Sequence, residues 1–324
     1  MDRRSFSRAT LAAAVAAIAG AGHAQTAPYP SRTVKIIAPV APGGGVDLVA
    51  RTVAERLQKA LAQPFIVDNM SGGGGVIAAQ ATMRAPADGY TLMLGYVATH
   101  GTNPAMRNIP YDAVKDFTAI AMVAGTPNVL VVGSGVPAAS VKELVALAKR
   151  SPLSFGSAGQ GSLTHLLVEQ FKLAVDIQAT HAPYRGIAPA ITDVLGGQTQ
   201  FMMPGLAAAL QHIKSGKLRP LAVTGNKRHA VLPEVPTFEE LGFSGFTAVQ
   251  WYGIVGPAKM PLAVVSRLNE EINRAIALPE LRERLSGEAL EPMPMSSAEF
   301  SAFIAAEVAR WTKLVRERNI EIGT

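Results

Sequence analysis

Four glycine-rich turns are the segments whose residue types and spacing could bind a ligand. Each one follows an apolar run that predicts a strand and precedes a stretch with helical spacing. Such a turn places backbone N–H groups and the positive end of a helix at the carboxyl edge of a sheet, which suits an anion. No lysine-containing phosphate-binding motif accompanies them, so they favour small carboxylates over nucleotides. The turns are Pro42–Asp47, Ser71–Gly75, Gly156–Ser162 and Tyr184–Gly186.

Motifs for catalysis and for metal binding are absent from the sequence. It has no Gly-x-x-x-x-Gly-Lys-Ser/Thr, no Gly-x-Ser-x-Gly and no His-Glu-x-x-His. With 0 Cys there is no disulfide, thiolate zinc site or thiol nucleophile. We therefore expect no enzyme activity, no cofactor and no metal. The alternative that stays open is a periplasmic hydrolase or isomerase using His100 or His165 as its base, although His165 and Glu169, at i,i+4, favour a structural pair.

The N-terminus has the layout of an export signal. Arg3 and Arg4 precede an apolar stretch, Leu11–Ala21, and small residues lead up to Ala24. A membrane span needs about 20 apolar residues, so an uncleaved anchor is disfavoured. We predict a twin-arginine-like signal peptide over 1–24, cleaved near Ala24, and a periplasmic protein. A simple Sec signal is the alternative route.

The charge of the chain is spread rather than clustered. The formal net charge is +6, and removal of the predicted signal peptide lowers it to +4. The remaining sequence has no block of five like charges, and only 6% of residues are aromatic. These features argue against nucleic-acid binding.

Alternating strand and helix patterns predict an α/β fold with mainly parallel sheets. About 300 residues remain after the signal peptide, which is large for one sheet, so we expect two lobes. No long Pro/Ser/Gly tether is present, and the chain is expected to cross between lobes near 117–130 and near 245–255. The predicted boundaries are 25–122 plus 250–324 for the first lobe and 123–249 for the second.

The sequence resembles the Bug family, the extracytoplasmic receptors of tripartite tricarboxylate transporters. The resemblance extends over nearly the whole chain after the signal peptide, and it depends on the order of several short motifs. They are Tyr29–Arg32, Val40–Asp47, Gly72–Gly75, Pro86–Leu92, Thr99–Pro104, Tyr111–Asp112 with Asp116–Phe117, Phe155–Gly159, Pro183–Gly186, Gly216–Arg219 and Leu232–Thr237.

This resemblance implies a two-lobed type II periplasmic binding-protein fold with two crossover strands and a ligand cleft between the lobes. It also implies capture of a small carboxylate, such as a di- or tricarboxylate or an aromatic acid, for a two-subunit membrane permease. A sensory ligand-binding subunit is the alternative, and a monomer is expected. The implied ligand-binding residues are Gly43, Gly44, Gly45, Asp47, Gly73, Gly74, Ala98, Thr99, Ser157, Gly159, Gly161, Ser162, Thr164, His165, Tyr184 and Gly186.

The sequence departs from the family pattern at a few positions. The stretch Phe201–Gly205 is apolar where many relatives have an acidic or amide residue, which disfavours an amino-acid ligand. Tyr96 stands where a small hydroxyl residue is common and is a candidate aromatic wall. Trp251 and Tyr252 could each line the cleft or pack in the crossover strand, and both alternatives stay open. Whether Arg185 contacts the ligand also stays open.

Overall fold

The computed structural model describes residues 29–317 and residue 320. The chain divides into two compact units, Met1–Ser31 and Arg32–Thr324. In the first unit only 29–31 are described, and their Tyr29–Pro30 peptide bond is cis. The predicted signal peptide, 1–24, lies outside the described residues.

A six-stranded sheet forms the centre of one half of the Arg32–Thr324 unit, which we call the first lobe. Its strand order is β11-β4-β10-β3-β1-β2. The strands are β1 (Val34–Ala38), β2 (Phe65–Asn69), β3 (Thr91–Tyr96), β4 (Phe117–Pro127), β10 (Val249–Pro257) and β11 (Glu291–Pro292). The helical elements of this lobe are α2 (Gly45–Leu61), η1 (Gly73–Gly75), α3 (Val76–Met83), η2 (Ala98–Thr102), α4 (Asn103–Met106), α9 (Leu262–Ala277), α10 (Pro279–Gly287) and α11 (Ser297–Glu317).

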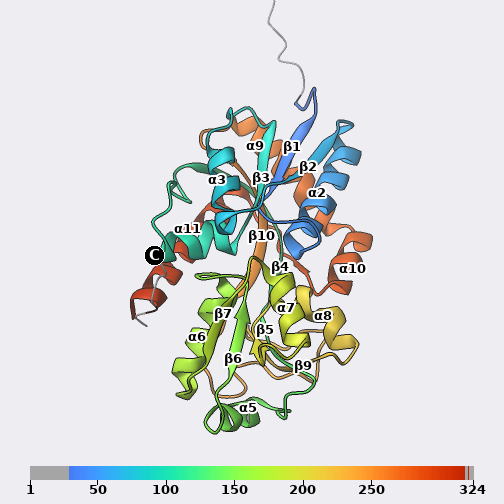
Figure 1. The fold of residues 1–324 in the computed structure, drawn as a ribbon. Coiled ribbons are helices and arrows are strands. Elements are labelled where there is room, and N and C mark those ends of the chain that lie inside the picture. The colour runs from blue at the N-terminus through green and yellow to red at the C-terminus, as the bar shows by residue number, and fades with distance from the viewer. Residues whose placement is uncertain (1–28, 318–319, 321–324) are drawn as a thin grey trace, which may run out of the picture. The chain divides into compact units, whose positions relative to one another are not determined.

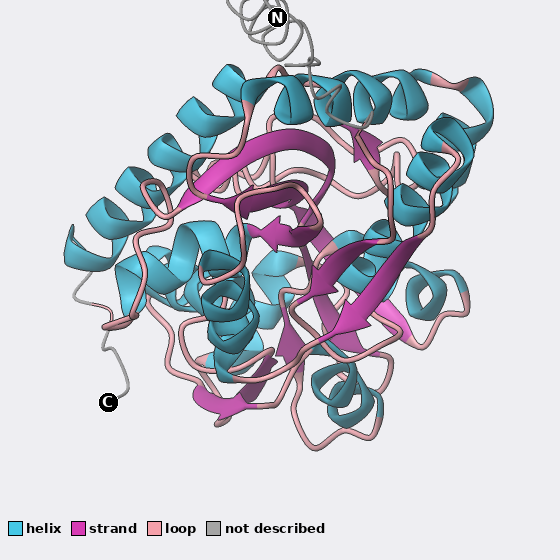
Figure 2. Cartoon of the chain, turned by 90° about the horizontal axis from the view of Figure 1, so that it is seen from above, coloured by secondary structure: helices cyan, strands magenta, loops and turns pink. Residues whose placement is uncertain are grey.

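A five-stranded sheet with strand order β7-β6-β8-β5-β9 forms the second lobe. Figure 1 shows its helices packed around the lower sheet, and Figure 2 shows helices flanking the sheets when the molecule is seen from above. The strands are β5 (Val129–Gly133), β6 (Ser154–Ser157), β7 (Thr180–Pro183), β8 (Phe201–Met202) and β9 (Leu218–Val223), and the helices are α5 (Val141–Ala148), α6 (Leu163–Val175), α7 (Ile187–Leu195) and α8 (Leu206–Lys214).

Both sheets are mixed, and the expectation of mainly parallel sheets is wrong. Strand β1 is parallel to β2 and β3, and β6 is parallel to β7 and β8. Strand β10, however, runs antiparallel to β3 and β4, and β5 runs antiparallel to β8 and β9. The strand–helix alternation reveals the parallel pairs but carries no signal for strands that are paired only by the tertiary fold.

The chain passes from one sheet to the other near the ends of β4 and β10. Strand β4 ends at Pro127, and β5 begins at Val129 in the second sheet. The intervening Asn128 is buried and fixes this passage, because its N–H donates to Thr224 Oγ1 at 2.8 Å and its Nδ2 donates to Met203 O at 3.0 Å. The chain returns between β9 and β10.

The core of the first lobe joins the crossover strand β10 to the C-terminal helix α11. A β carbon on Gly253 would lie 2.3 Å from Phe300 Cζ, so glycine is needed for this contact. The indole nitrogens of Trp251 and Trp311 both donate to Glu307 Oε2, at 3.1 and 3.0 Å. Trp251 has 0% exposure, so it packs in the core.

Local sequence accounts for the start of several helices. Ser140 caps α5 by accepting from Glu143 N at 3.2 Å, and Glu143 Oε2 accepts in return from Ala139 N. Pro279 occupies the first turn of α10, where a missing N–H costs nothing. No helix among the described residues has both the length and the apolar content needed to span a membrane.

Candidate functional site

The glycine turns of the first lobe gather at one edge of its sheet. Because β2 and β3 both pair in parallel with β1, the segments that follow these three strands emerge on the same side. These segments are 39–44, 70–75 and 97–102. The turns predicted from the sequence as a carboxylate site are therefore neighbours in this lobe.

Helix α2 presents its N-terminus to this edge without a side-chain cap. Its N-cap residue is Gly44, in an extended conformation with φ −97°. The N–H of Leu48 donates to the carbonyl oxygen of this N-cap residue, Gly44, at 3.0 Å. The N–H groups at the start of a helix have no partner within the helix, so they are available to an anion at this edge.

Asp47 holds the first turn in place. Its Oδ2 accepts from Gly43 N at 3.1 Å and from Arg51 Nε at 3.0 Å, and its Oδ1 accepts from Asn69 Nδ2 at 2.8 Å. Burial acts to raise the pKa of Asp47, but the bonds from Arg51, Asn69 and Gly43 outweigh it and hold that pKa below its usual range. The carboxylate is thus ionised and bonded to the turn.

The second turn of this lobe requires glycine for two reasons. Residues Gly72 to Gly75 all have positive φ, between 57° and 133°. A β carbon on Gly75 would lie 2.5 Å from Thr99 Cγ2, so the turn packs directly on the segment after β3. Asn103 Nδ2 donates to Gly74 O at 2.9 Å and further fixes it.

The segment Ala98–Thr102 forms one turn of π-helix, a feature often found at functional sites. Thr99 has 0% exposure, and its Oγ1 accepts from Tyr96 N at 3.2 Å and lies 2.8 Å from His100 Nδ1. His100 is fully buried, and this burial lowers its pKa to about 3, so the imidazole is neutral. A ligand beside this segment would meet Ala98 and backbone groups rather than the side chains of Thr99 and His100.

The second-lobe turn Gly156–Ser162 is held by hydroxyl and imidazole side chains. Ser157 Oγ accepts from Gly159 N at 3.1 Å and lies 2.6 Å from His181 Nε2. Ser162 is the N-cap of α6 and lies 2.9 Å, between hydroxyl oxygens, from Thr164. Thr164 Oγ1 in turn accepts from Ala158 N at 2.9 Å. Ser157, Gly159, Ser162 and Thr164, all predicted from the sequence, are therefore held by hydrogen bonds within this turn.

Two histidines far apart in the sequence lie stacked beneath this turn. The ring centroids of His165 and His181 are 4.0 Å apart with an interplanar angle of 14°. His165 Nδ1 accepts from Gly161 N at 3.2 Å, which requires an unprotonated Nδ1. Burial lowers the pKa of each ring to about 4, and neighbouring positive charge, including Lys172, adds to this.

Tyr184 and Gly186 extend the second-lobe site. Tyr184 N donates to Ser157 O at 3.1 Å, and a β carbon on Gly159 would lie 3.1 Å from Tyr184 O. The Tyr184 hydroxyl donates to Asp193 Oδ2 at 2.6 Å. Gly186 is the uncapped N-cap of α7, while Arg185 is exposed.

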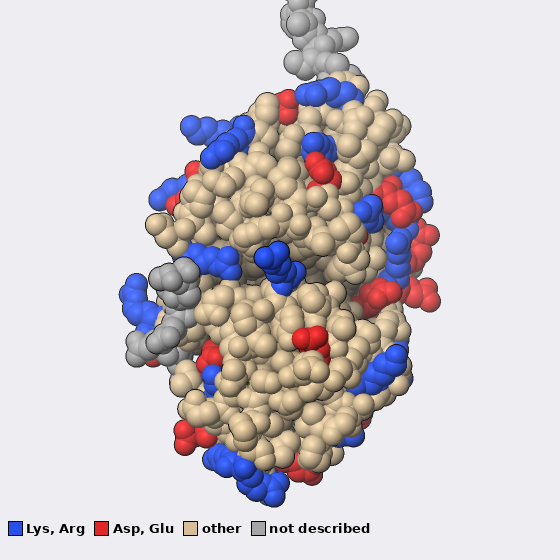
Figure 3. All heavy atoms as spheres, viewed as in Figure 1, with Lys and Arg blue, Asp and Glu red and all other residues tan. Residues whose placement is uncertain are grey.

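Arg107, which the sequence reasoning missed, connects the turns of the two lobes. Its Nη1 donates to Gly73 O at 3.2 Å in the first lobe, and its Nη2 donates to Gln160 O in the second. A β carbon on Gly161 would lie 3.3 Å from Met106 Cβ, so the two lobes are in contact here. Lys and Arg atoms lie along the line where the two halves meet in Figure 3.

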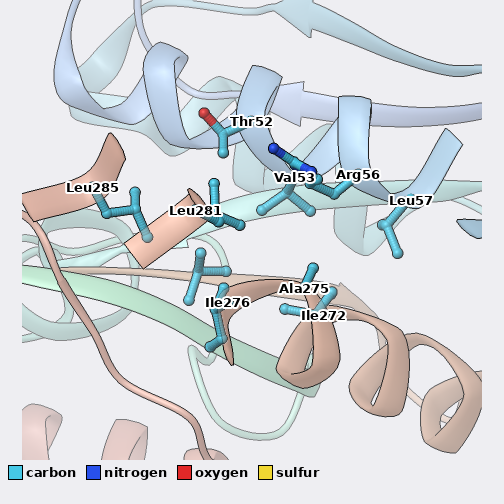
Figure 4. Close-up of a pocket in the computed structure, with 10 residues that line it drawn as sticks. Thr52, Val53, Arg56, Leu57, Ile272, Ala275, Ile276, Leu281 and Leu285 are labelled. Atoms are coloured by element: carbon cyan, nitrogen blue, oxygen red, sulfur yellow. The ribbon is translucent and has the colours of Figure 1, made fainter. Parts of the chain in front are cut away.

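A separate hollow lies away from these turns. It is formed by α2, α9 and α10, and apolar side chains such as Leu57, Ile276 and Leu285 line it (Figure 4). Its polar residues are Thr52 and Arg56. No group of three or more His, Asp or Glu side chains suited to a metal ion occurs in the described part of the chain.

This fold and this site define a class of protein, the two-lobed solute-binding receptor of the periplasmic binding-protein type. The family model described as the tripartite tricarboxylate transporter family receptor matches residues 49–320. The chain belongs to this family. It is similar to Protein BugT of Bordetella pertussis, with 36% identity over 314 residues that cover 95% of each chain.

Solved structures agree with this assignment. Rpa4515 of R. palustris with adipate is 34% identical, with a TM-score of 0.86 over 90% of this chain and 98% of that one. MatC from Rhodopseudomonas palustris with bound malate is 30% identical, with a TM-score of 0.83 over 89% of this chain and 100% of that one. The periplasmic binding protein BugD is 31% identical, with a TM-score of 0.84 over 90% of this chain and 99% of that one.

Proposed function

We propose that this chain is an extracytoplasmic receptor that captures a small carboxylate and delivers it to a two-subunit membrane permease. The observation that carries the proposal is the pair of glycine-turn edges, one on each sheet, joined through Arg107. Each edge offers backbone N–H groups at a helix start, and together they suit the two ends of a dicarboxylate. Similar receptors hold adipate and malate.

The ligand-binding residues proposed here are those expected from the sequence, with their roles now distinguished. Gly44, Gly45, Gly73, Gly74 and Ala98 are proposed to contact ligand through the backbone in the first lobe, while Gly43, whose N–H donates to Asp47 Oδ2, is proposed to shape the turn. In the second lobe Gly186 is proposed to contact ligand through the backbone, while Gly159 and Gly161, whose N–H groups donate to Ser157 Oγ and His165 Nδ1, are proposed to shape the turn. The other side chains named from the sequence are proposed mainly to position these backbones: Asp47, Thr99, Ser157, Ser162, Thr164, His165 and Tyr184.

A panel of acids measured by thermal shift and calorimetry tests this proposal. Malate, adipate, citrate and nicotinate represent the proposed class, and glutamate and glucose are the comparison ligands. We expect a raised melting temperature with at least one acid and none with glucose. Folded protein that responds to no acid would contradict the proposal, and mass spectrometry of ligand co-purified with the native protein would name the true class.

Delivery and location need separate tests. We propose export through the segment 1–24 to the periplasm, and a monomer. We also propose lobes at 25–122 with 250–324 and at 123–249, so that both boundaries fall within the crossover strands β4 and β10. Cell fractionation with N-terminal sequencing checks export and cleavage near Ala24. Uptake of the labelled acid in a deletion strain separates transport from a sensory role, because a sensory subunit would leave uptake intact.

A hydrolase is the second candidate, because Ser157 Oγ lies 2.6 Å from His181 Nε2, a distance typical of a nucleophile and its base. The receptor proposal is preferred since Ser157 has 0% exposure and its hydroxyl is bonded to the backbone of Gly159. Ester turnover that disappears in Ser157→Ala would favour the hydrolase.

A further inference from the structure

Two tyrosines stand side by side at the ligand edge of the first lobe. Tyr96 is the last residue of β3, and Tyr252 is its direct partner across the antiparallel pairing with β10. Directly opposed residues point to the same face of a sheet. The Tyr96 ring also approaches the second glycine turn, because a β carbon on Gly75 would lie 3.6 Å from Tyr96 Cε1.

The hydroxyl of Tyr252 lies at the start of helix α2. A β carbon on Gly45, the first residue of the helix, would lie 2.9 Å from Tyr252 Oη. No side chain caps this helix, and Asp47 in its first turn is bonded to Gly43, Arg51 and Asn69. The tyrosine hydroxyl and the first N–H groups of the helix therefore lie at one place.

Tyr252 is buried, yet its hydroxyl has no partner within the described part of the chain. The residue is 4% exposed and no hydrogen bond to its Oη is found there. Its Oη is not among the fully buried polar atoms that lack a partner, so a small part of the hydroxyl surface stays accessible. Burial raises the pKa of Tyr252, and the neighbouring Tyr96 raises that pKa further. The Tyr252 phenol is therefore neutral and can donate a hydrogen bond.

Tyr111, the other buried tyrosine of the described residues, satisfies its hydroxyl internally, and so does the half-buried Tyr184. Tyr111 donates to Thr99 O at 2.8 Å, and Tyr184 donates to Asp193 Oδ2 at 2.6 Å. A tyrosine that served only to pack the core would be expected to do the same. The contrast indicates that the partner of Tyr252 comes from outside the protein.

We propose that Tyr252 Oη and the first N–H groups of α2 together bind one carboxylate of the ligand, with Tyr96 forming the adjacent wall. This inference rests on the proposed receptor function and adds the side-chain donor that the glycine turns lack. The ligand end held here is an anion surrounded by neutral donors, as expected for a carboxylate and not for an ammonium group.

Calorimetry with malate and adipate on Tyr252→Phe tests the proposal. The substitution removes one hydroxyl and keeps the ring. We expect affinity for the acid that the wild type binds to fall about 10- to 100-fold, as for loss of one hydrogen bond to a charged group. Tyr90→Phe is the matched control, because Tyr90 directly precedes the opposite end of β3 and should leave affinity unchanged.

The outcomes separate this inference from the proposed function. A wild type that binds neither these acids nor the wider acid panel overturns both. A wild type that binds an acid with equal affinity in Tyr252→Phe overturns only the tyrosine assignment.

A second measurement avoids dependence on the folding of the variant. The chain has 6 Tyr, so incorporation of 3-fluorotyrosine gives few fluorine NMR resonances, and loss of one in Tyr252→Phe assigns it. The Tyr252 resonance should shift when the bound acid is added, and an unchanged resonance at saturation would refute the contact.

Discussion

Arg107 Nη2 donates to the carbonyl oxygen of Gln160, across the junction between the two lobes. The same guanidinium donates through Nη1 to Gly73 O at 3.2 Å. One cationic side chain therefore holds the two turns that we propose to face the ligand. Its five fixed donors suit this bridging better than the single ammonium of lysine.

Arg107→Met is predicted to favour an open arrangement of the lobes and to weaken acid binding about 10-fold, because two hydrogen bonds from a charged donor are lost. The affinity of Arg107→Lys for the acid should fall between that of the wild type and that of Arg107→Met. The chain has 0 Cys, so Gln58→Cys on α2 and Lys142→Cys on α5 allow spin labels to report the distance between lobes.

The matched control for this prediction is Arg150→Met, which removes an exposed arginine two residues beyond the end of α5. It should leave both the label distance and the affinity unchanged. An identical distance distribution in Arg107→Met and the wild type would show that Arg107 does not hold the lobes together.

Gly44→Leu is predicted to abolish binding while the protein stays folded. Gly44 has φ −97°, which any residue can adopt, and nothing lies within 4 Å of a β carbon placed there. We expect a loss of about 1 kcal/mol in unfolding free energy, from the poorer helix N-cap. Gly135→Leu, with equally open space in the second lobe, is the control and should bind normally.

Gly159 is a less clean probe than Gly44. Its φ is +126°, and its β carbon would lie 3.1 Å from Tyr184 O, so a side chain there strains the turn itself. Binding that survives in Gly44→Leu would remove the first turn from the site.

Stability is predicted to fall as pH drops from about 6.5 to about 4. The pKa of His165 and that of His181 are each about 4 in the folded protein, against 6.5 as the ordinary value. Between these values the unfolded chain binds more protons, so the free energy of unfolding rises with pH by up to about 1.4 kcal/mol per pH unit for each histidine. Denaturant unfolding across this pH range measures it.

His181→Gln should make this dependence shallower without abolishing it, since burial also lowers the pKa of His100, His165 and His229. His212→Gln on α8 is the control and should keep the slope of the wild type. A stability that is constant between pH 7 and pH 4 would contradict the burial of the histidine pair.

Glu307→Ala is predicted to destabilise the first lobe by about 2–4 kcal/mol, because it leaves two buried indole N–H groups without their acceptor. The chain has only 2 Trp, so intrinsic fluorescence reports this site directly. The tryptophan emission of Glu307→Ala should differ from that of the wild type, while its affinity for the acid should stay the same. Full stability of the variant, measured by urea unfolding, would show that the indoles find another acceptor.

The sequence by itself determined the local features of this protein. Positions with positive φ, such as Gly72 to Gly75, favour a residue without a β carbon. A run of glycines therefore predicts a turn from the sequence. The same holds for the capping box at Ser140 and for most strands and helices, because hydrophobic periodicity and capping act over a few residues.

Tertiary structure alone decided which distant residues meet. Trp251 and Tyr252 are adjacent in a strand, so alternation places their side chains on opposite faces of the sheet. Only the packing of α11 buries the face that carries Trp251 and leaves Tyr252 directed toward Gly45. The stacking of His165 on His181 and the bridge made by Arg107 likewise join residues with no common motif. Such contacts depend on sheet order and lobe contact, which local spacing does not encode.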